Sequence, residues 1–130
     1  MGKRDYIEVY GNDYDTPDGT AIRDYIHVSD LADIHVEVGK YLLRNSESNL
    51  FNCGYGRGFS VLDVINTANK LYNNKVNYEF SKRREGDVEN LVAENKKILK
   101  YINWKPRYND LNKIIDTSIK WEKKINASDK

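Results

Sequence analysis

The chain has 130 residues, which gives room for one domain with one modest hydrophobic core. Its 21 Lys and Arg residues nearly balance 20 Asp and Glu residues, so a net charge of +1 supplies no long-range field to gather nucleic acid or an anionic membrane. A single cysteine, Cys53, excludes an internal disulfide, and no segment has the length and apolarity of a membrane span or a signal peptide. We therefore expect a cytoplasmic protein that holds any anionic ligand with a few local cations.

Short strands and helices are predicted to alternate from the first residues onward. Residues 7–10 alternate apolar and polar side chains, which predicts a short strand. Residues 25–28 are β-prone and are followed by Ser29 and Asp30, either of which is a typical cap for the helix predicted next. Residues 49–53 are an apolar-rich run stopped by a glycine, which predicts another strand.

The strongest helical pattern begins at Ser60. Ser60 and Asp63 resemble a capping box, and the apolar residues that follow lie on one face of a helix. Residues 76–80 then alternate as a half-buried strand is expected to do.

Two further helices are predicted towards the end of the chain. Asn95 is predicted to cap a short helix that stops before Pro106, because the residue before a proline is disfavoured in helical conformation. The last amphipathic helix is predicted to begin near Asp110, with Leu111, Ile114, Ile115, Ser118 and Ile119 facing inward. We predict one domain over residues 1–122 and a polar tail over 123–130 that frays. The fold class is a small mixed α/β domain with short strands and about four helices.

Residues 54–60 have the glycine-rich composition of a dinucleotide-binding loop and lie between a predicted strand and a predicted helix. However, Phe59 stands where that fingerprint needs a glycine, so a tight turn leading into the helix is the stronger interpretation.

The Tyr-x-x-x-Lys pattern of short-chain dehydrogenases requires both residues on one helix, so that the lysine lowers the pKa of the tyrosine. Tyr78 lies in a predicted strand, too far from Lys82, and Lys105 precedes a proline and cannot continue the helix of Tyr101. We interpret both matches as coincidental and predict no catalytic residue.

Two arginine-containing segments are candidates for binding a phosphorylated ligand. In residues 83–87, an arginine is suited to fork onto a diphosphate while Asp87 accepts hydrogen bonds from sugar hydroxyls. Arg23 and Tyr25 form a second such group. On composition alone, surface ion pairs are the favoured interpretation of both segments, and His27 is interpreted as structural. No His, Cys or carboxylate spacing indicates a metal site.

In chain order, several motifs form a series: residues 10–14 (YGNDY), 16–20 (TPDGT), 23–33 (RDYIHVSDLAD), 51–56 (FNCGYG), 60–64 (SVLDV) and 83–87 (RREGD). This series resembles the carboxyl-terminal portion of UDP-glucose 4-epimerases, members of the extended short-chain dehydrogenase family, from about residue 2 to about residue 121. The resemblance implies the fold of the substrate-binding part of such an enzyme.

The resemblance also implies a UDP-sugar site. The segment around Val9 and Tyr10 is expected to line the uracil pocket, Arg23 and Arg84 to clamp the diphosphate, and Asp87 to hold the ribose hydroxyls. This assignment agrees with the chemistry, because a diphosphate favours bidentate cations and a ribose favours a carboxylate.

Two further residues complete the implied site. Tyr25 is expected to support the same pocket. Leu91 stands four residues beyond Asp87, at a gatekeeper position that is a tyrosine in some members and small in others. Its intermediate size favours UDP-glucose and UDP-galactose, and leaves N-acetylated sugars open.

The resemblance further implies that family members bind NAD and carry their catalytic Tyr and Lys in an amino-terminal Rossmann half, whose motifs this sequence does not contain. We therefore expect this chain alone to bind no NAD and not to interconvert UDP-glucose and UDP-galactose. Three hypotheses remain open: part of an epimerase completed by a Rossmann-half polypeptide, a non-catalytic UDP-sugar-binding module, or a non-functional truncated fragment. An exposed apolar surface is expected to favour weak stability or self-association.

Overall fold

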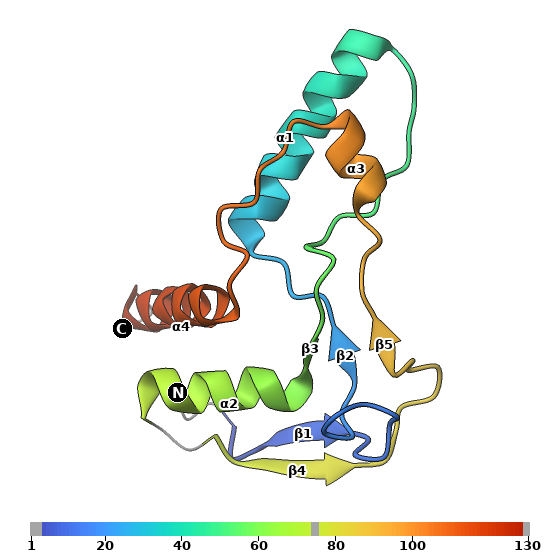
Figure 1. The fold of residues 1–130 in the computed structure, drawn as a ribbon. Coiled ribbons are helices and arrows are strands. Elements are labelled where there is room, and N and C mark those ends of the chain that lie inside the picture. Colours follow the sequence, from blue (N-terminus) through green and yellow to red (C-terminus); the bar gives the residue numbers. More distant parts are fainter. Residues whose placement is uncertain (1–3, 74–75, 129–130) are drawn as a thin grey trace.

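The computed structural model describes residues 4–73 and 76–128. Figure 1 shows the elements, which are β1 (Ile7–Tyr10), β2 (Ile22–Arg23), α1 (Val28–Asn45), β3 (Phe59–Ser60), α2 (Val61–Tyr72), β4 (Tyr78–Ser81), β5 (Asn90–Leu91), α3 (Lys96–Tyr101) and α4 (Leu111–Ser128). Within the described ranges this is a small mixed α/β domain with short strands and four helices, as the sequence predicts.

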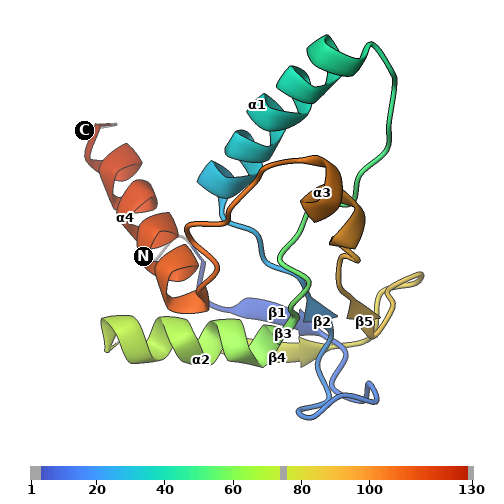
Figure 2. The same ribbon diagram turned by 45° about the horizontal axis from the view of Figure 1, so that its top comes forward.

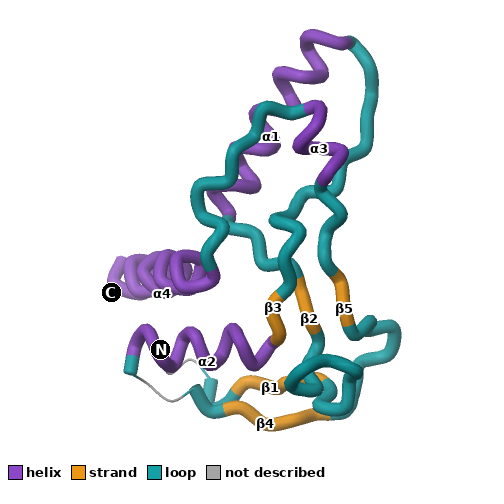
Figure 3. The backbone as a smooth tube through the Cα atoms, viewed as in Figure 1, coloured by secondary structure: helices purple, strands orange, loops and turns teal. Residues whose placement is uncertain are grey.

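The strands form two small sheets near α2, while α1 and α3 lie at the other end of the molecule (Figure 3). β1 pairs with β4 in parallel, so that Val9 lies opposite Phe80. In the second sheet β2 is central, antiparallel to β3 and parallel to β5. Arg23 is therefore flanked by Phe59 on one side and by Leu91 on the other, and direct cross-strand partners face the same side of a sheet.

The main hydrophobic cluster joins α1 to α3 and to the segment after α3. Its buried members are Ile34, Ile98, Ile102 and Trp104. A second contact joins α2 and α4, whose relation is visible in Figure 2. None of the helices that the structure describes is long and apolar enough to cross a membrane.

The start of α2 follows the sequence pattern closely. The backbone N–H of Asp63 donates to the Ser60 hydroxyl at 2.9 Å, and the backbone N–H of Ser60 donates to the Asp63 carboxylate at 3.0 Å. The predicted capping box is therefore confirmed.

The start of α1 differs from the prediction. The helix begins at Val28, its N-cap is His27, and the His27 ring Nδ1 accepts a hydrogen bond from the backbone N–H of Ser29 at 3.0 Å. The expected caps, Ser29 and Asp30, thus lie inside the first turn, and residues 25–28 form no strand. Asp30 is unavailable as a cap because its carboxylate binds backbone groups of a distant segment.

Two strand predictions and one detail of a helix cap are also corrected. Residues 49–53 are not a strand, because no described segment pairs with them. The strand predicted at 76–80 lies at Tyr78–Ser81, and Tyr78 and Phe80 are substantially exposed instead of half-buried. Asn95 is the N-cap residue of α3 as predicted, but its side chain makes no capping hydrogen bond, and its amide donates to the Gly54 carbonyl at 3.0 Å instead.

The carboxyl-terminal helix is longer than expected. α4 continues to Ser128, so residues 123–128 are helical instead of frayed. Leu111 and Ile115 are buried in it as predicted, whereas Ser118 is exposed. The short α3 ends at Tyr101, before Pro106, which confirms the predicted stop.

Candidate functional site

Two arginines and one carboxylate from distant parts of the chain meet at one place. The Asp87 carboxylate accepts hydrogen bonds from Arg84 Nε at 2.9 Å and from Arg23 Nη2 at 3.4 Å. Arg23 is positioned by the central strand β2, and the other two residues by the loop between β4 and β5. Since one negative charge lies between two positive charges, the cluster keeps an excess positive charge that suits an anion.

The geometry leaves donors available for such an anion. Arg23 Nη1 donates to the Ile22 carbonyl at 2.7 Å, which fixes the guanidinium against its own strand. A guanidinium carries five N–H donors, and these contacts use only part of that capacity. The cluster can therefore bind a phosphate oxygen without first breaking its internal contacts.

Tyr10 belongs to the same surface. The Arg84 guanidinium lies 4.6 Å from the centroid of the Tyr10 ring, and the Tyr10 hydroxyl donates to Glu8 at 2.7 Å. That hydrogen bond lowers the pKa of the exposed Glu8 carboxyl below its usual range. Val9 is buried, with 1% of its surface exposed, so only its backbone can contribute to a ligand site.

Tyr25 lies two residues beyond Arg23 and is half-buried. Burial raises the pKa of its hydroxyl, and the charge of Arg23 opposes that rise, which places the two side chains within electrostatic reach. The structure therefore puts Tyr25 near the cluster, although no hydrogen bond within the described chain joins it to Asp87.

Leu91 lines an open hollow of about 590 Å³ beside the cluster. The hollow is bounded by Arg23, Asp24 and the segments 51–53 and 91–94. Leu91 is the strand partner of Arg23 and is 60% exposed. Its side chain therefore borders a space into which a group attached to a bound diphosphate can extend.

Asp24 holds the site together through hydrogen bonds that the sequence does not predict. Its carboxylate accepts backbone N–H groups from Tyr55 at 3.0 Å, Gly56 at 2.9 Å and Ala93 at 3.3 Å. It thereby fastens the turn after residue 53 and the end of β5 to the strand that carries Arg23. The Arg-Asp-Tyr tripeptide suggested an ion pair, whereas the partners of the carboxylate are backbone groups of distant segments.

The same contacts decide whether residues 54–60 fit a dinucleotide. A pyrophosphate would need free backbone N–H groups in this turn. Those of Tyr55 and Gly56 already bind Asp24, whose charge would also repel a phosphate. A Cβ built on Gly54 would lie 2.5 Å from Asp24 Oδ2, so the absence of a side chain at this glycine is what lets the carboxylate approach the backbone. The segment does not fit NAD.

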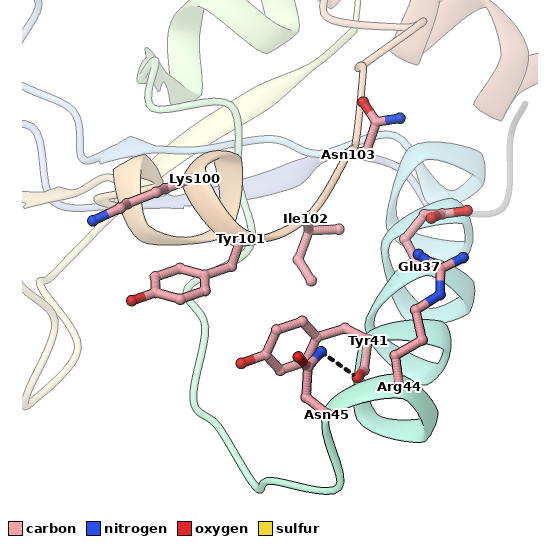
Figure 4. Close-up of a pocket in the computed structure, with 8 residues that line it drawn as sticks. All are labelled: Glu37, Tyr41, Arg44, Asn45, Lys100, Tyr101, Ile102 and Asn103. Carbon is pink, nitrogen blue, oxygen red and sulfur yellow. Dashed lines mark hydrogen bonds between the residues drawn. The ribbon is translucent and has the colours of Figure 1, made fainter.

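A separate hollow of about 360 Å³ lies between α1 and the end of α3 (Figure 4). Its polar groups do not converge on a common point. Lys100 extends away from α1, and the Asn45 amide is held by the Tyr41 carbonyl at 2.8 Å. Among the described residues, no group of three His, Cys, Asp or Glu side chains could hold a metal ion. The arginine cluster is therefore the best candidate site.

Comparison with known proteins gives consistent matches. The family model described as GDP-mannose 4,6 dehydratase matches residues 1–117. The UDP-glucose 4-epimerase of Azospirillum brasilense is 44% identical over 128 residues, which are 98% of this chain and 37% of that relative. The chain thus spans little more than a third of the length of the curated relatives it matches.

The solved structures that match the chain also include UDP-sugar 4-epimerases. The UDP-Glc/GlcNAc 4-epimerase from Campylobacter jejuni has a TM-score of 0.83 at 44% identity, covering 95% of this chain and 37% of its own. A UDP-glucose 4-epimerase from Stenotrophomonas maltophila, with bound NAD and formylated UDP-arabinopyranose, has a TM-score of 0.88 at 34% identity, covering 95% and 36%. The chain therefore belongs to the GDP-mannose 4,6 dehydratase family and is similar to the carboxyl-terminal portion of UDP-glucose 4-epimerases.

Proposed function

We propose that the chain is the UDP-sugar-binding part of a UDP-glucose 4-epimerase. The observation that carries the proposal is the convergence of Arg23, Arg84 and Asp87, which are brought together from β2 and from a loop more than 60 positions later in the chain. The relatives named above, one of them solved with a UDP-sugar bound, support this choice of ligand.

Each residue has a role in this proposal. Arg23 and Arg84 bind the diphosphate from two sides, since guanidinium groups match phosphate oxygens bidentately. Asp87 accepts hydrogen bonds from the ribose hydroxyls. Tyr10, with the backbone at Val9, borders the uracil.

The placement of Asp87 between the two arginines serves this role twice. In the free protein it holds both guanidinium groups in position, so that less side-chain entropy is lost when the nucleotide binds. In the complex it offers acceptor oxygens to the ribose while the arginines turn their remaining donors to the diphosphate. The hexose extends into the hollow bordered by Leu91, and Tyr25 supports Arg23 from behind.

The chain contributes binding and orientation to the reaction. NAD supplies hydride chemistry when it is bound by an epimerase of this kind. The described residues offer neither a dinucleotide loop nor a Tyr-x-x-x-Lys pair on one helix: Tyr78 lies in β4, and Tyr101 is the last residue of α3. We therefore propose that this chain binds UDP-sugars but needs further polypeptide for turnover.

Calorimetric titration with UDP tests the proposal. We expect binding in the micromolar-to-millimolar range and, for Arg84→Ala, at least about tenfold weaker binding, because a charge-assisted contact to phosphate is lost. Arg44→Ala is the matched control, since Arg44 is an exposed arginine on α1 remote from the cluster. Failure of the folded wild-type chain to bind UDP would remove the proposed function.

The size of Leu91 is expected to select among hexoses. In a hybrid that carries this chain in place of the matched segment of the A. brasilense relative, we expect UDP-glucose to be epimerised faster than its N-acetylated counterpart. Leu91→Ala should narrow that difference by opening the hollow, whereas Leu99→Ala, an exposed leucine on α3, should not change it. Equal wild-type rates on both substrates would show that Leu91 does not restrict the pocket.

A further inference from the structure

Polar side chains gather on one face of the two-stranded sheet formed by β1 and β4. Successive side chains of a strand point to opposite faces, so Glu8 and Tyr10 point the same way. The register places Glu8 opposite Glu79 and Tyr10 opposite Ser81. Ser81 is the last residue of β4, and the loop that carries Arg84 follows it. This face of the sheet therefore adjoins the arginine cluster.

Glu8 holds two hydroxyl groups on this face, one at each carboxylate oxygen. The Tyr10 hydroxyl donates to Oε2 at 2.7 Å, and the Ser81 hydroxyl donates to Oε1 at 3.1 Å. These two hydrogen bonds lower the pKa of the Glu8 carboxyl, which is therefore ionised at neutral pH. A carboxylate held at both oxygens has a fixed orientation, and it fixes the direction of the Tyr10 ring in turn.

The Tyr10 ring supports the Arg84 guanidinium together with Asp87. The guanidinium lies 4.6 Å from the ring centroid, and Nε lies 2.9 Å from the Asp87 carboxylate. The Arg84 side chain is 61% exposed, and an exposed ion pair alone holds such a long side chain weakly. If the ring were free to turn, Arg84 would lose a support, and more of its side-chain entropy would be lost when a ligand binds.

The charge of Glu8 by itself opposes the binding of an anion. Glu8 and Glu79 are both exposed and lie opposite each other, and like charges at directly opposite strand positions are unfavourable. Glu8 also adds negative charge beside the guanidinium proposed to bind a diphosphate. Any benefit of Glu8 to the site must therefore come from its hydrogen bonds.

We infer that Glu8 is a positioning residue of the UDP site, which acts through the Tyr10 hydroxyl to hold Arg84 in the orientation that binds the diphosphate. The inference rests on the proposed function for the identity of the ligand. It does not require contact between Glu8 and the nucleotide. The contribution of Glu8 to affinity should consequently depend on the Tyr10 hydroxyl and run against the effect of its own charge.

Titration with UDP separates positioning from charge. We expect Glu8→Ala to weaken UDP binding by about threefold to tenfold, although it removes a repelling charge. Glu8→Gln should restore most of that affinity, because its amide oxygen still accepts the Tyr10 hydroxyl. Tyr10→Phe should lose about as much as Glu8→Ala, and the double variant should lose no more than either single variant. Glu79→Ala, the control on the same face, should not weaken binding.

Proton NMR of the free chain shows the position of Arg84 without UDP. The ring current of Tyr10 should shift the Arg84 side-chain protons upfield. Glu8→Ala should remove that shift, and Glu8→Gln should keep it. If the shift depends on Glu8 in this way but the wild-type chain does not bind UDP, the proposed function fails while the positioning of Arg84 by Glu8 is supported.

Other results would overturn the inference. An Arg84 shift that persists in Glu8→Ala would show that the ring keeps its place without the carboxylate. Unchanged or tighter UDP binding by Glu8→Ala would leave Glu8 with the effect of its charge alone. A Glu8→Gln variant as weak as Glu8→Ala, or additive losses in the double variant, would show that Glu8 does not act through the Tyr10 hydroxyl. Because Glu8 is exposed and Tyr10→Phe keeps the ring, these variants are expected to fold.

Discussion

Replacing Asp30 by alanine is expected to destabilise the folded chain by about 3 kcal/mol or more. Asp30 is fully buried, and its carboxylate accepts the Tyr55 hydroxyl at 2.6 Å and the backbone N–H groups of Arg107 at 3.0 Å and Tyr108 at 2.9 Å. The substitution leaves these donors without their acceptor in a buried place. It also releases the segment that connects α3 to α4 from the first turn of α1.

Urea denaturation measures this loss, and Asp33→Ala is a matched control. Asp33 is one turn further along α1, and its carboxylate binds the Arg107 guanidinium at 2.5 Å in a partly exposed position. An exposed ion pair of this kind contributes about 0.2–1 kcal/mol. Similar losses for the two variants would contradict the role assigned to Asp30.

The pH dependence gives a second readout for the same residue. Burial raises the pKa of Asp30, but the hydrogen bonds from Tyr55, Arg107 and Tyr108 together lower it below its usual range. The stabilisation is therefore present above the unfolded pKa of about 3.9 and is lost as the pH falls through the folded pKa. The stability difference between the wild type and Asp30→Asn should accordingly shrink below about pH 4.

Local interactions were the predictable part of this fold. The capping box of α2 involves groups only three positions apart, so the sequence alone identified both partners. The predicted strand at 49–53 has the right alternation, but a strand also requires a neighbour, which no local pattern reveals.

Long-range contacts set the limit of prediction from sequence. The sequence does not predict that Asp30 and Asp24 link distant segments. Both carboxylates bind backbone N–H groups, which every residue except proline has, so no residue type marks the partner. The meeting of Arg23 with Asp87 was expected only through the resemblance to epimerases; composition favoured separate surface ion pairs.

The second large expected effect is that of removing the Asp24 carboxylate. Asp24→Ala is expected to weaken UDP binding by about tenfold or more and to destabilise the chain by about 2 kcal/mol, because three backbone N–H groups lose their acceptor. Without the carboxylate, the end of β5 and the turn at Tyr55 are no longer fastened to β2. The position of Arg23 relative to the hollow beside Leu91 is then no longer fixed.

Titration with UDP and urea denaturation of the same samples separate a positioning role from direct ligand contact. Asp24→Asn keeps one acceptor oxygen but turns an amide N–H₂ towards backbone donors, so both losses should be intermediate. Asp15→Ala, at an exposed carboxylate in the turn before β2, should leave both quantities unchanged. A different result would contradict this role: Asp24→Ala lowers stability while UDP affinity stays at the wild-type value. In that case the arginine cluster is held by β2 alone, and the hydrogen bonds of Asp24 stabilise the fold without positioning the UDP site.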